Sequence, residues 1–463
     1  MNPRRLQIVL YFHLLLVGLF RAGASEGQLL VLVTNGPIST SLNLVMLAEG
    51  YTRLDQELFE THARRAANGI LGAPPFSSYQ RYFNVFGIFV ESREAGADKP
   101  QLGIQRDTYF NSTYRSFGID RLLTIPPNDV NRSPEDGEGK VNRLLMQLIP
   151  EYDVAAVLVN DSDYGGSGGP ILVISANSAA AELAAHEMGH SFARLGDEYS
   201  DPFPGYPDIE EPNTTREIRR ELLKWRKWVL ASTPIPTSDS LPFRNLLGLF
   251  EGAHYHAQGW YRPRYECKMR RLNRPFCEVC AESLTLNVFT RLGVVRSTAP
   301  LRSAAVPVSA FLPQRFSLET FAAPDDAVHV EWTLNASPLA TTDVTAVELI
   351  GSSLGDGTNV LKASVRIESP RVRNDPAGAL GELVVWHVFR DPHSRPPLQI
   401  RQTGDGVELL WPGTAGGFRL ETSTEPQSSS WRQVPGTPLA AGGFWMLRLP
   451  LADNVRFFRL NRE

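Results

Sequence analysis

Residues 177–199 read NSAAAELAAHEMGHSFARLGDEY, and this stretch decides the fold of the region around it. Its alanine-rich run, in which either of the first two residues can act as the cap, predicts a long helix that continues to about Leu195. Gly196 is expected to end that helix. His186 and His190 stand four residues apart, so they lie on one helix face, one turn from each other.

This pair of histidines predicts a metal site. Two imidazoles on one helix face can bind a single ion, which is what tetrahedral zinc requires of two of its ligands. We therefore predict His186 and His190 as zinc ligands and one catalytic zinc ion as the cofactor. Glu187 can reach a water molecule at the metal without binding the metal, so it is predicted to be the catalytic general base. The alternative, a surface helix with two unrelated histidines, fits poorly with a motif on a strongly predicted helix shortly after a strand.

The third zinc ligand has to come from beyond the helix, where an acidic pair follows directly. In the metzincin pattern the third ligand stands six residues after the second histidine, beyond a glycine three residues after it. Here the sixth position is Gly196 and the seventh is Asp197, so the spacing is one residue longer. Asp197 is the first choice for the third ligand, and Glu198 remains the alternative.

The composition is that of an ordinary globular protein. Of 463 residues, 42% are hydrophobic and 21% are charged, which excludes a largely disordered chain and a polytopic membrane protein. The formal net charge of -4 shows no basic excess, so no nucleic-acid partner is expected. Only 3 cysteines are present, which excludes a scaffold held together by disulfides.

The first 24 residues have the features of a secretory signal peptide. Arg4 and Arg5 precede an apolar run, and residues 22–24 form a cleavage site of small residues. Because the run is shorter than the ~20 residues that a membrane-spanning helix needs, cleavage is favoured over retention as an anchor. We therefore expect a secreted or periplasmic protein with no membrane span after removal of the signal.

Composition divides the rest of the chain into three regions. Residues 25–298 mix strand-like and helix-like segments, which is typical of an α/β (α+β) catalytic domain. Residues 306–392 alternate apolar and polar positions with a period of two, which predicts an immunoglobulin-like β-sandwich. Residues 398–463 predict a second, smaller β module. The junctions between the regions contain proline and serine, as linkers do.

Several blocks between residues 29 and 295 follow one another in the order of a known family. They comprise residues 42–52, 83–85, 91–98, 164–169, 186–199, 250–253, 261–263, 267–269 and 276–280. These blocks resemble the IgA-peptidase family of zinc metallopeptidases. The resemblance implies a metzincin-like zinc peptidase domain followed by two all-β sandwich-like modules. It also implies that His186 and His190 bind the zinc ion with Glu187 as the base, and that the acidic pair contributes the third ligand, with Asp197 preferred. Cleavage of immunoglobulin A, from which the family takes its name, is not assumed for this chain.

The downstream block contains sulfur-bearing residues whose roles stay open. Met269 is expected either in a Met-turn beneath the zinc or as an ordinary core residue. Cys267, Cys277 and Cys280 would suit a zinc knuckle, but no fourth ligand is evident from the sequence. Since an exported chain favours a disulfide, we expect Cys267 to pair with one of the other two and to leave one free thiol.

Histidine and tyrosine residues near this block offer weaker signals. His254 and His256 share a face if their stretch is a strand, but both are expected to be ordinary loop residues rather than ligands. Tyr199, Tyr255 and Tyr261 each have a hydroxyl that can stabilise an oxyanion, and nothing in the sequence selects one of them.

Together these features predict a secreted zinc metalloendopeptidase whose partner is a protein or peptide substrate. The alternative is a secreted adhesin or binding protein with a structural or degenerate metal site. A structural zinc site normally has four protein ligands, and only three can be named here. The intact motif, with Glu187 in place, also argues against a degenerate site.

Overall fold

The computed structural model describes most of the chain. The described residues are 26–127, 135–203, 206–303, 305–340, 345–427, 429–451 and 455–462. The signal peptide predicted for residues 1–24 lies outside them. Within the described ranges, no helix has both the length and the apolar character that crossing a membrane requires.

A six-stranded mixed sheet is the framework of the first part of the chain, in the order β1-β3-β2-β4-β6-β5. Its strands are β1 (Gln28–Val33), β2 (Leu42–Glu49), β3 (Phe83–Phe89), β4 (Val154–Val159), β5 (Gly166–Ser167) and β6 (Ile171–Ser175). The four inner strands run parallel, and β1 and β5 are antiparallel edge strands. Every residue of β2, β3 and β4 is buried, as expected where helices cover both faces of a parallel sheet.

Helices cover the two faces of this sheet. α1 (Gln56–Gly72) and α4 (Ala180–Ala193) share one buried cluster with the sheet, and α3 (Gly137–Leu148) packs on the opposite face. α1 and α4 touch closely, because a Cβ atom at Gly69 would lie 2.3 Å from the Ala181 carbonyl oxygen. The remaining helices are α2 (Phe76–Tyr79), α5 (Glu278–Leu292), η1 (Ile38–Thr40), η2 (Arg53–Asp55), η3 (Gln80–Tyr82), η4 (Pro100–Leu102), η5 (Ser116–Gly118), η6 (Arg220–Leu222), η7 (Arg226–Trp228) and η8 (Gly351–Ser353).

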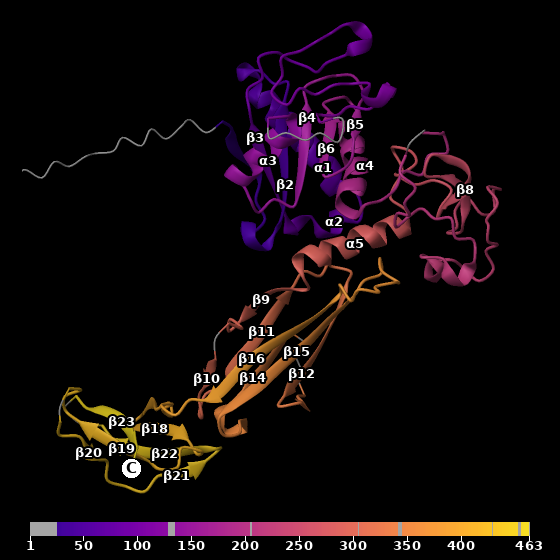
Figure 1. Cartoon of the computed structure of the whole chain (residues 1–463). Coiled ribbons are helices and arrows are strands. Elements are labelled where there is room, and N and C mark those ends of the chain that lie inside the picture. Colours follow the sequence, from indigo (N-terminus) through magenta and orange to yellow (C-terminus); the bar gives the residue numbers. More distant parts are fainter. Residues whose placement is uncertain are drawn as a thin grey trace, which may run out of the picture.

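A long, largely irregular segment connects α4 to α5. It contains the hairpin of β7 (Phe250–Ala253) and β8 (His256–Arg262) and encloses the buried side chains of Trp225 and Trp260. In Figure 1 this segment lies to one side of α4 and α5. It therefore brings residues distant in the sequence to the carboxyl end of α4.

Two sheets follow α5 and pack face to face. The first, in the order β14-β11-β9, consists of β9 (Val295–Ala299), β11 (Gln314–Thr320) and β14 (Ala346–Leu349). The second, in the order β10-β16-β15-β12-β13, consists of β10 (Val306–Val308), β12 (Ala327–Leu334), β13 (Ser337–Pro338), β15 (Thr358–Glu368) and β16 (Gly381–Arg390). Phe316 of the first sheet contacts Trp386 of the second, with ring centroids 5.7 Å apart. Trp332 stacks on the same indole.

A smaller group of strands ends the chain (Figure 1). It contains β17 (Gln399–Thr403), β18 (Gly406–Pro412), β19 (Phe418–Ser423), β20 (Arg432–Gln433), β21 (Leu439–Ala441), β22 (Phe444–Pro450) and β23 (Phe457–Arg462). Leu409, Trp411 and Leu420 belong to its separate hydrophobic core. The fold-class prediction is confirmed at this level, because a mixed α/β part is followed by β-sheet modules. The domain bounds given above stay a prediction.

Candidate metal centre

α4, which packs on one face of the central sheet, carries the histidine motif. The Asn177 side chain accepts a hydrogen bond from the Ala179 N–H at 2.8 Å, just ahead of the first helical turn. Arg194 ends the helix in a left-handed conformation with φ 53°, and its N–H donates to the His190 carbonyl at 2.8 Å. The helix thus ends at Ala193, two residues earlier than predicted, and turns the chain back toward its own last turn.

Three ligand atoms converge beside this turn. His186 Nε2 and His190 Nε2 lie 3.3 Å apart. Asp197 Oδ1 lies 3.2 Å from the first of these atoms and 3.4 Å from the second. In a tetrahedral zinc site with ligand distances of about 2.0–2.1 Å, neighbouring ligand atoms are about 3.3–3.4 Å apart. The three atoms therefore fit three corners of one tetrahedron.

Hydrogen bonds on the far side of each imidazole orient the rings. His186 Nδ1 lies 2.9 Å from the Lys268 carbonyl, and His190 Nδ1 lies 2.6 Å from the Leu195 carbonyl. A carbonyl oxygen only accepts, so each Nδ1 carries the proton, and a neutral ring then presents its Nε2 lone pair. Within the described chain, Asp197 Oδ1 is buried beside these two Nε2 atoms and has no hydrogen-bond donor. Three acceptors that face one another need a cation between them.

The electrostatics of the buried groups agree with this conclusion. Burial would lower the pKa of His190, but the charge of Asp197, its hydrogen bond and the charge of Glu187 together outweigh burial and raise that pKa to about 9. Burial would likewise raise the pKa of Asp197, but the interaction with His190 and the hydrogen bond from His186 hold it well below its usual range. The pocket therefore favours a positive charge among these side chains, supplied by protons or by a metal ion. For Glu187, burial raises the pKa against the opposing effect of the two histidines.

The two members of the acidic pair point in different directions. The Tyr255 hydroxyl donates to Asp197 Oδ2 at 2.5 Å, so Oδ1 is turned toward the imidazoles. Glu198 instead accepts a hydrogen bond from Asn213 Nδ2 at 2.9 Å and lies 3.8 Å from Cys280 Sγ. The geometry therefore brings Asp197, and not Glu198, to the histidine pair.

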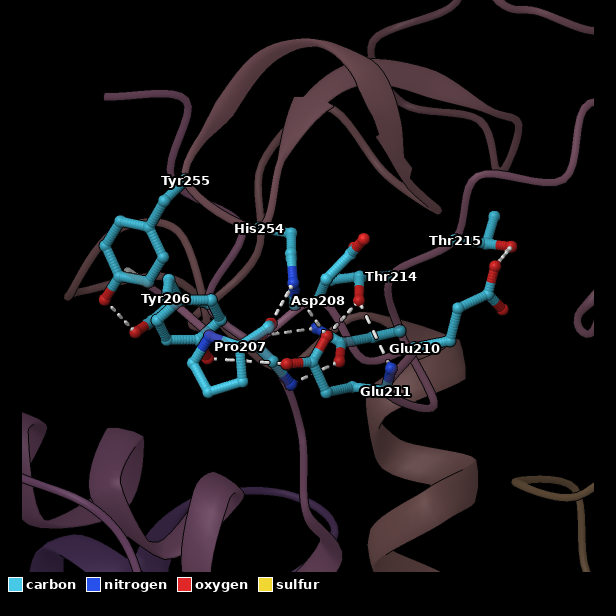
Figure 2. Close-up of polar contacts among 12 residues, drawn as sticks. Tyr206, Pro207, Asp208, Glu210, Glu211, Thr214, Thr215, His254 and Tyr255 are labelled. Carbon is cyan, nitrogen blue, oxygen red and sulfur yellow. Dashed lines mark hydrogen bonds and ion pairs between the residues drawn. The ribbon is translucent and has the colours of Figure 1, made fainter. Parts of the chain in front are cut away.

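A polar network supports the loop that carries this acidic pair. Figure 2 shows His254 in contact with Glu211 and Pro207, with its Nδ1 2.9 Å from Glu211 Oε2 and its Nε2 2.8 Å from the Pro207 carbonyl. The His254 ring also stacks on Trp260, with ring centroids 3.8 Å apart, and the backbone N–H of His254 donates to the Asp197 carbonyl at 3.0 Å. His254 thus holds the loop in place through contacts that leave neither ring nitrogen directed at the histidine pair.

The glycine-rich segment of β5 lies against the other side of the site. A Cβ atom at Gly168 would lie 2.6 Å from His190 Cβ, and one at Gly166 would lie 3.1 Å from Glu187 Oε1. Tyr164, 38% exposed, precedes this segment, and its pKa is raised by burial and by the charges of Glu187 and Asp197. The sequence pointed to residues 164–169 only as one block of the family resemblance, and their contact with the histidine motif was not predicted. The four glycines that flank Ser167 were the available signal.

Comparisons with known proteins bear on this site. The sequence model of a family described as IgA Peptidase M64 matches residues 30–245 and 239–288. No curated protein matches the chain. The solved structures that match include Bacteroides ovatus mixed-linkage glucan utilization locus SGBP-B in complex with mixed-linkage heptasaccharide, at 12% identity and a TM-score of 0.16. That match covers 36% of this chain and 44% of the other, so this chain spans less than half of that protein, and at this TM-score the likeness carries no argument.

Proposed function

We propose, from the premise that the chain belongs to the IgA peptidase M64 family and is a peptidase, that it is a zinc-dependent endopeptidase. His186, His190 and Asp197 are the proposed zinc ligands, and Glu187 is the proposed general base. The observation that carries this proposal is the convergence of three buried acceptor atoms, 3.2–3.4 Å apart, with both Nδ1 atoms engaged elsewhere.

The roles follow from the chemistry of each group. A zinc ion held by these ligands supplies a Lewis acid and lowers the pKa of water toward 7. Glu187 lies in the helical turn between the two histidines and is buried, and its raised pKa favours proton uptake. We assign it the transfer of a proton from the attacking water to the departing amine. We assign Tyr255 the role of a positioning residue, because its hydroxyl donates to the proposed ligand Asp197.

A metzincin-like arrangement is the finer part of the proposal. The Met269 sulfur lies beneath the motif, because a Cβ atom at Gly189 would stand 2.7 Å from Met269 Sδ. The neighbouring Lys268 holds His186 through its carbonyl and forms an ion pair with Glu182 of the same helix at 2.6 Å. The turn at residues 267–269 therefore supports the ligand helix, as a Met-turn would. Export of the enzyme is likewise a proposal, based on the signal-like residues 1–24.

Cleavage of an unfolded protein substrate by the purified chain tests the proposal. We expect cleavage that a chelator abolishes and added zinc restores. Glu187→Gln should keep its zinc and its fold but lose cleavage, because an amide cannot take up the proton. Cleavage that persists in the chelated protein, or in Glu187→Gln, would exclude this mechanism. Absence of cleavage by the zinc-loaded wild type on a broad panel of mucosal and unfolded proteins would favour the binding-protein alternative.

A further inference from the structure

A second group of potential ligands includes Glu198, the residue next to Asp197, and the three cysteines. Cys267, Cys277, Cys280 and Glu198 are all buried, and one ligand atom from each lies within 4.8 Å of the others. All three cysteines of the chain are free. Cys280 Sγ lies 3.7 Å from Cys267 Sγ and 3.5 Å from Cys277 Sγ, whereas a disulfide requires about 2.0 Å. The disulfide expected from the sequence is therefore not formed, and Glu198 is a candidate for the fourth ligand that was not evident from the sequence.

The separations match a tetrahedral metal site. Zinc–sulfur bonds of about 2.3 Å place two sulfurs of one tetrahedron about 3.8 Å apart, and a carboxylate oxygen about 3.6 Å from a sulfur. The observed values are 3.7 and 3.5 Å between sulfurs, and 3.8 Å between Cys280 Sγ and Glu198 Oε1. These three separations from Cys280 Sγ, with all four atoms within 4.8 Å of one another, are compatible with a site for an ion that prefers thiolates.

The local backbone is also that of a metal site. Cys277 is the N-cap of α5 and Cys280 lies in its first turn, which gives the spacing Cys-x-x-Cys that is common in structural zinc sites. The Cys277 N–H donates to Cys267 Sγ at 3.3 Å, and the Asn213 amide donates to Glu198 Oε1 at 2.9 Å. Such outer contacts orient the ligands around a metal ion.

Nearby arginines can balance the negative charge that the four ligands carry in excess of a bound zinc ion. Three thiolates and one carboxylate carry four negative charges, which exceed the charge of one zinc ion by two. Arg262, only 3% exposed, and Arg270 act electrostatically on Glu198. Arg264 interacts in the same way with Cys267 and Cys277. Glu198 Oε2 is buried and finds no hydrogen-bond partner in the described part of the chain, which leaves it available to a cation.

We propose that Cys267, Cys277, Cys280 and Glu198 bind a second, structural zinc ion. Four protein ligands close the site, so it has no open position for water and no role in the chemistry. Its ligands come from the loop after α4, the turn after β8 and the start of α5, so it ties three segments together. This proposal does not depend on the peptidase activity.

The structural ion would also support the histidine centre. Glu198 follows Asp197 directly, and its N–H donates to the Met269 carbonyl at 2.9 Å. Cys267 precedes Lys268, whose carbonyl holds His186. Loss of the second ion is therefore expected to weaken zinc binding by the histidines, whereas loss of the histidines leaves the second ion in place.

Metal analysis of the full-length protein tests this asymmetry. We expect two zinc ions per chain in the wild type and one in the variant His186→Ala/His190→Ala. We expect a thiolate-to-cobalt charge-transfer absorption in both proteins after exchange of zinc for Co²⁺. Cys280→Ser should lose this absorption, and Ser283→Ala, one turn along α5, should keep it. These wild-type and histidine-variant measurements decide the question even if Cys280→Ser fails to fold.

Titration of thiols in the denatured, chelated protein adds an independent readout. Three reactive thiols per chain are expected before any reductant is added. A single thiol, together with a mass lower by two hydrogens, would establish a disulfide and overturn the proposal. A histidine variant without bound metal, or cobalt protein without charge-transfer absorption, would overturn it as well. Any of these outcomes leaves a chelator-sensitive peptidase possible, so failure here is distinct from failure of the proposed function.

Discussion

Replacing Tyr255 by phenylalanine removes one hydroxyl from the candidate metal centre and keeps the aromatic ring. That hydroxyl donates to Asp197 Oδ2 at 2.5 Å, while Asp197 Oδ1 faces the two imidazoles. Without it, the carboxylate loses the contact that fixes its rotation about the last side-chain bond. Tyr255→Phe should therefore weaken zinc binding through Asp197 and leave the two histidines in place.

The size of this effect follows from the kind of hydrogen bond that is lost. A hydrogen bond to a charged group contributes about 1.5–3 kcal/mol. About 1.4 kcal/mol corresponds to a tenfold change in a binding constant. We therefore expect zinc affinity to fall by about 10–100-fold, which is the usual range for removal of a partner that orients a metal ligand. Activity at saturating zinc should recover most of the loss, because the hydroxyl acts through Asp197 and the two imidazoles stay in place.

Competition with a chelator of known zinc affinity measures this loss, and urea unfolding of the zinc-free protein separates it from a general loss of stability. Tyr261→Phe is the matched control, because it makes the same change on β8, where the Tyr261 backbone pairs with Thr215. Unchanged zinc affinity in Tyr255→Phe would refute the positioning role. An equal loss in Tyr261→Phe would refute it too, since a distant hydroxyl would then matter as much.

Three further predictions concern the glycine-rich segment, a buried carboxyl group and the last β module. Gly168→Ala places a methyl group 2.6 Å from His190 Cβ, so we expect a loss of about 1–3 kcal/mol in unfolding free energy and weaker zinc binding; unchanged values in both assays would contradict the contact. Burial raises the pKa of Glu49 above its ordinary 4.5, so the folded chain holds this proton more tightly than the unfolded chain. The stability that Glu49 contributes is then lost as pH rises from 4.5 through the folded pKa. Urea unfolding should therefore show that the wild type loses stability relative to Glu49→Gln as pH rises over this range. Trp411→Ala should cost the C-terminal module about 3–5 kcal/mol, seen as faster limited proteolysis after residue 398, with zinc content and peptidase activity retained.

The helix and its histidine motif were accessible from the sequence because their signals are local. Alanine content, capping residues and the four-residue spacing depend only on neighbours along the chain. The choice between Asp197 and Glu198 was not accessible in this way, since the two are adjacent and chemically alike. The direction of each side chain is determined by partners distant in the sequence, namely Tyr255 for Asp197 and Asn213 for Glu198.

The fourth member of the cysteine group could not be predicted from the sequence either. Their spacing is compatible with a disulfide and with a zinc site, and the fourth ligand that separates the two possibilities stands about seventy residues earlier in the sequence. Glu198 reaches Cys280 only because α4 ends early and the chain turns back beside α5. A three-dimensional contact of this kind leaves no periodic pattern in the sequence, so the expectation of a disulfide followed from compartment alone.

The loop that follows α4 explains why both groups of ligands depend on tertiary packing. The loop lies outside helices and strands, and its backbone pairs with three segments distant in the sequence. The Gly196 N–H donates to Asn213 at 2.7 Å, the Asp197 carbonyl accepts from His254, and the Glu198 N–H donates to Met269. A Cβ atom at Gly196 would lie 2.4 Å from Glu211 Oε2, so a larger residue would have to displace the Glu211 carboxylate. Because the unfolded chain holds none of these contacts, metal binding and packing of this loop must occur together, and metal removal should loosen the loop before it affects the central sheet.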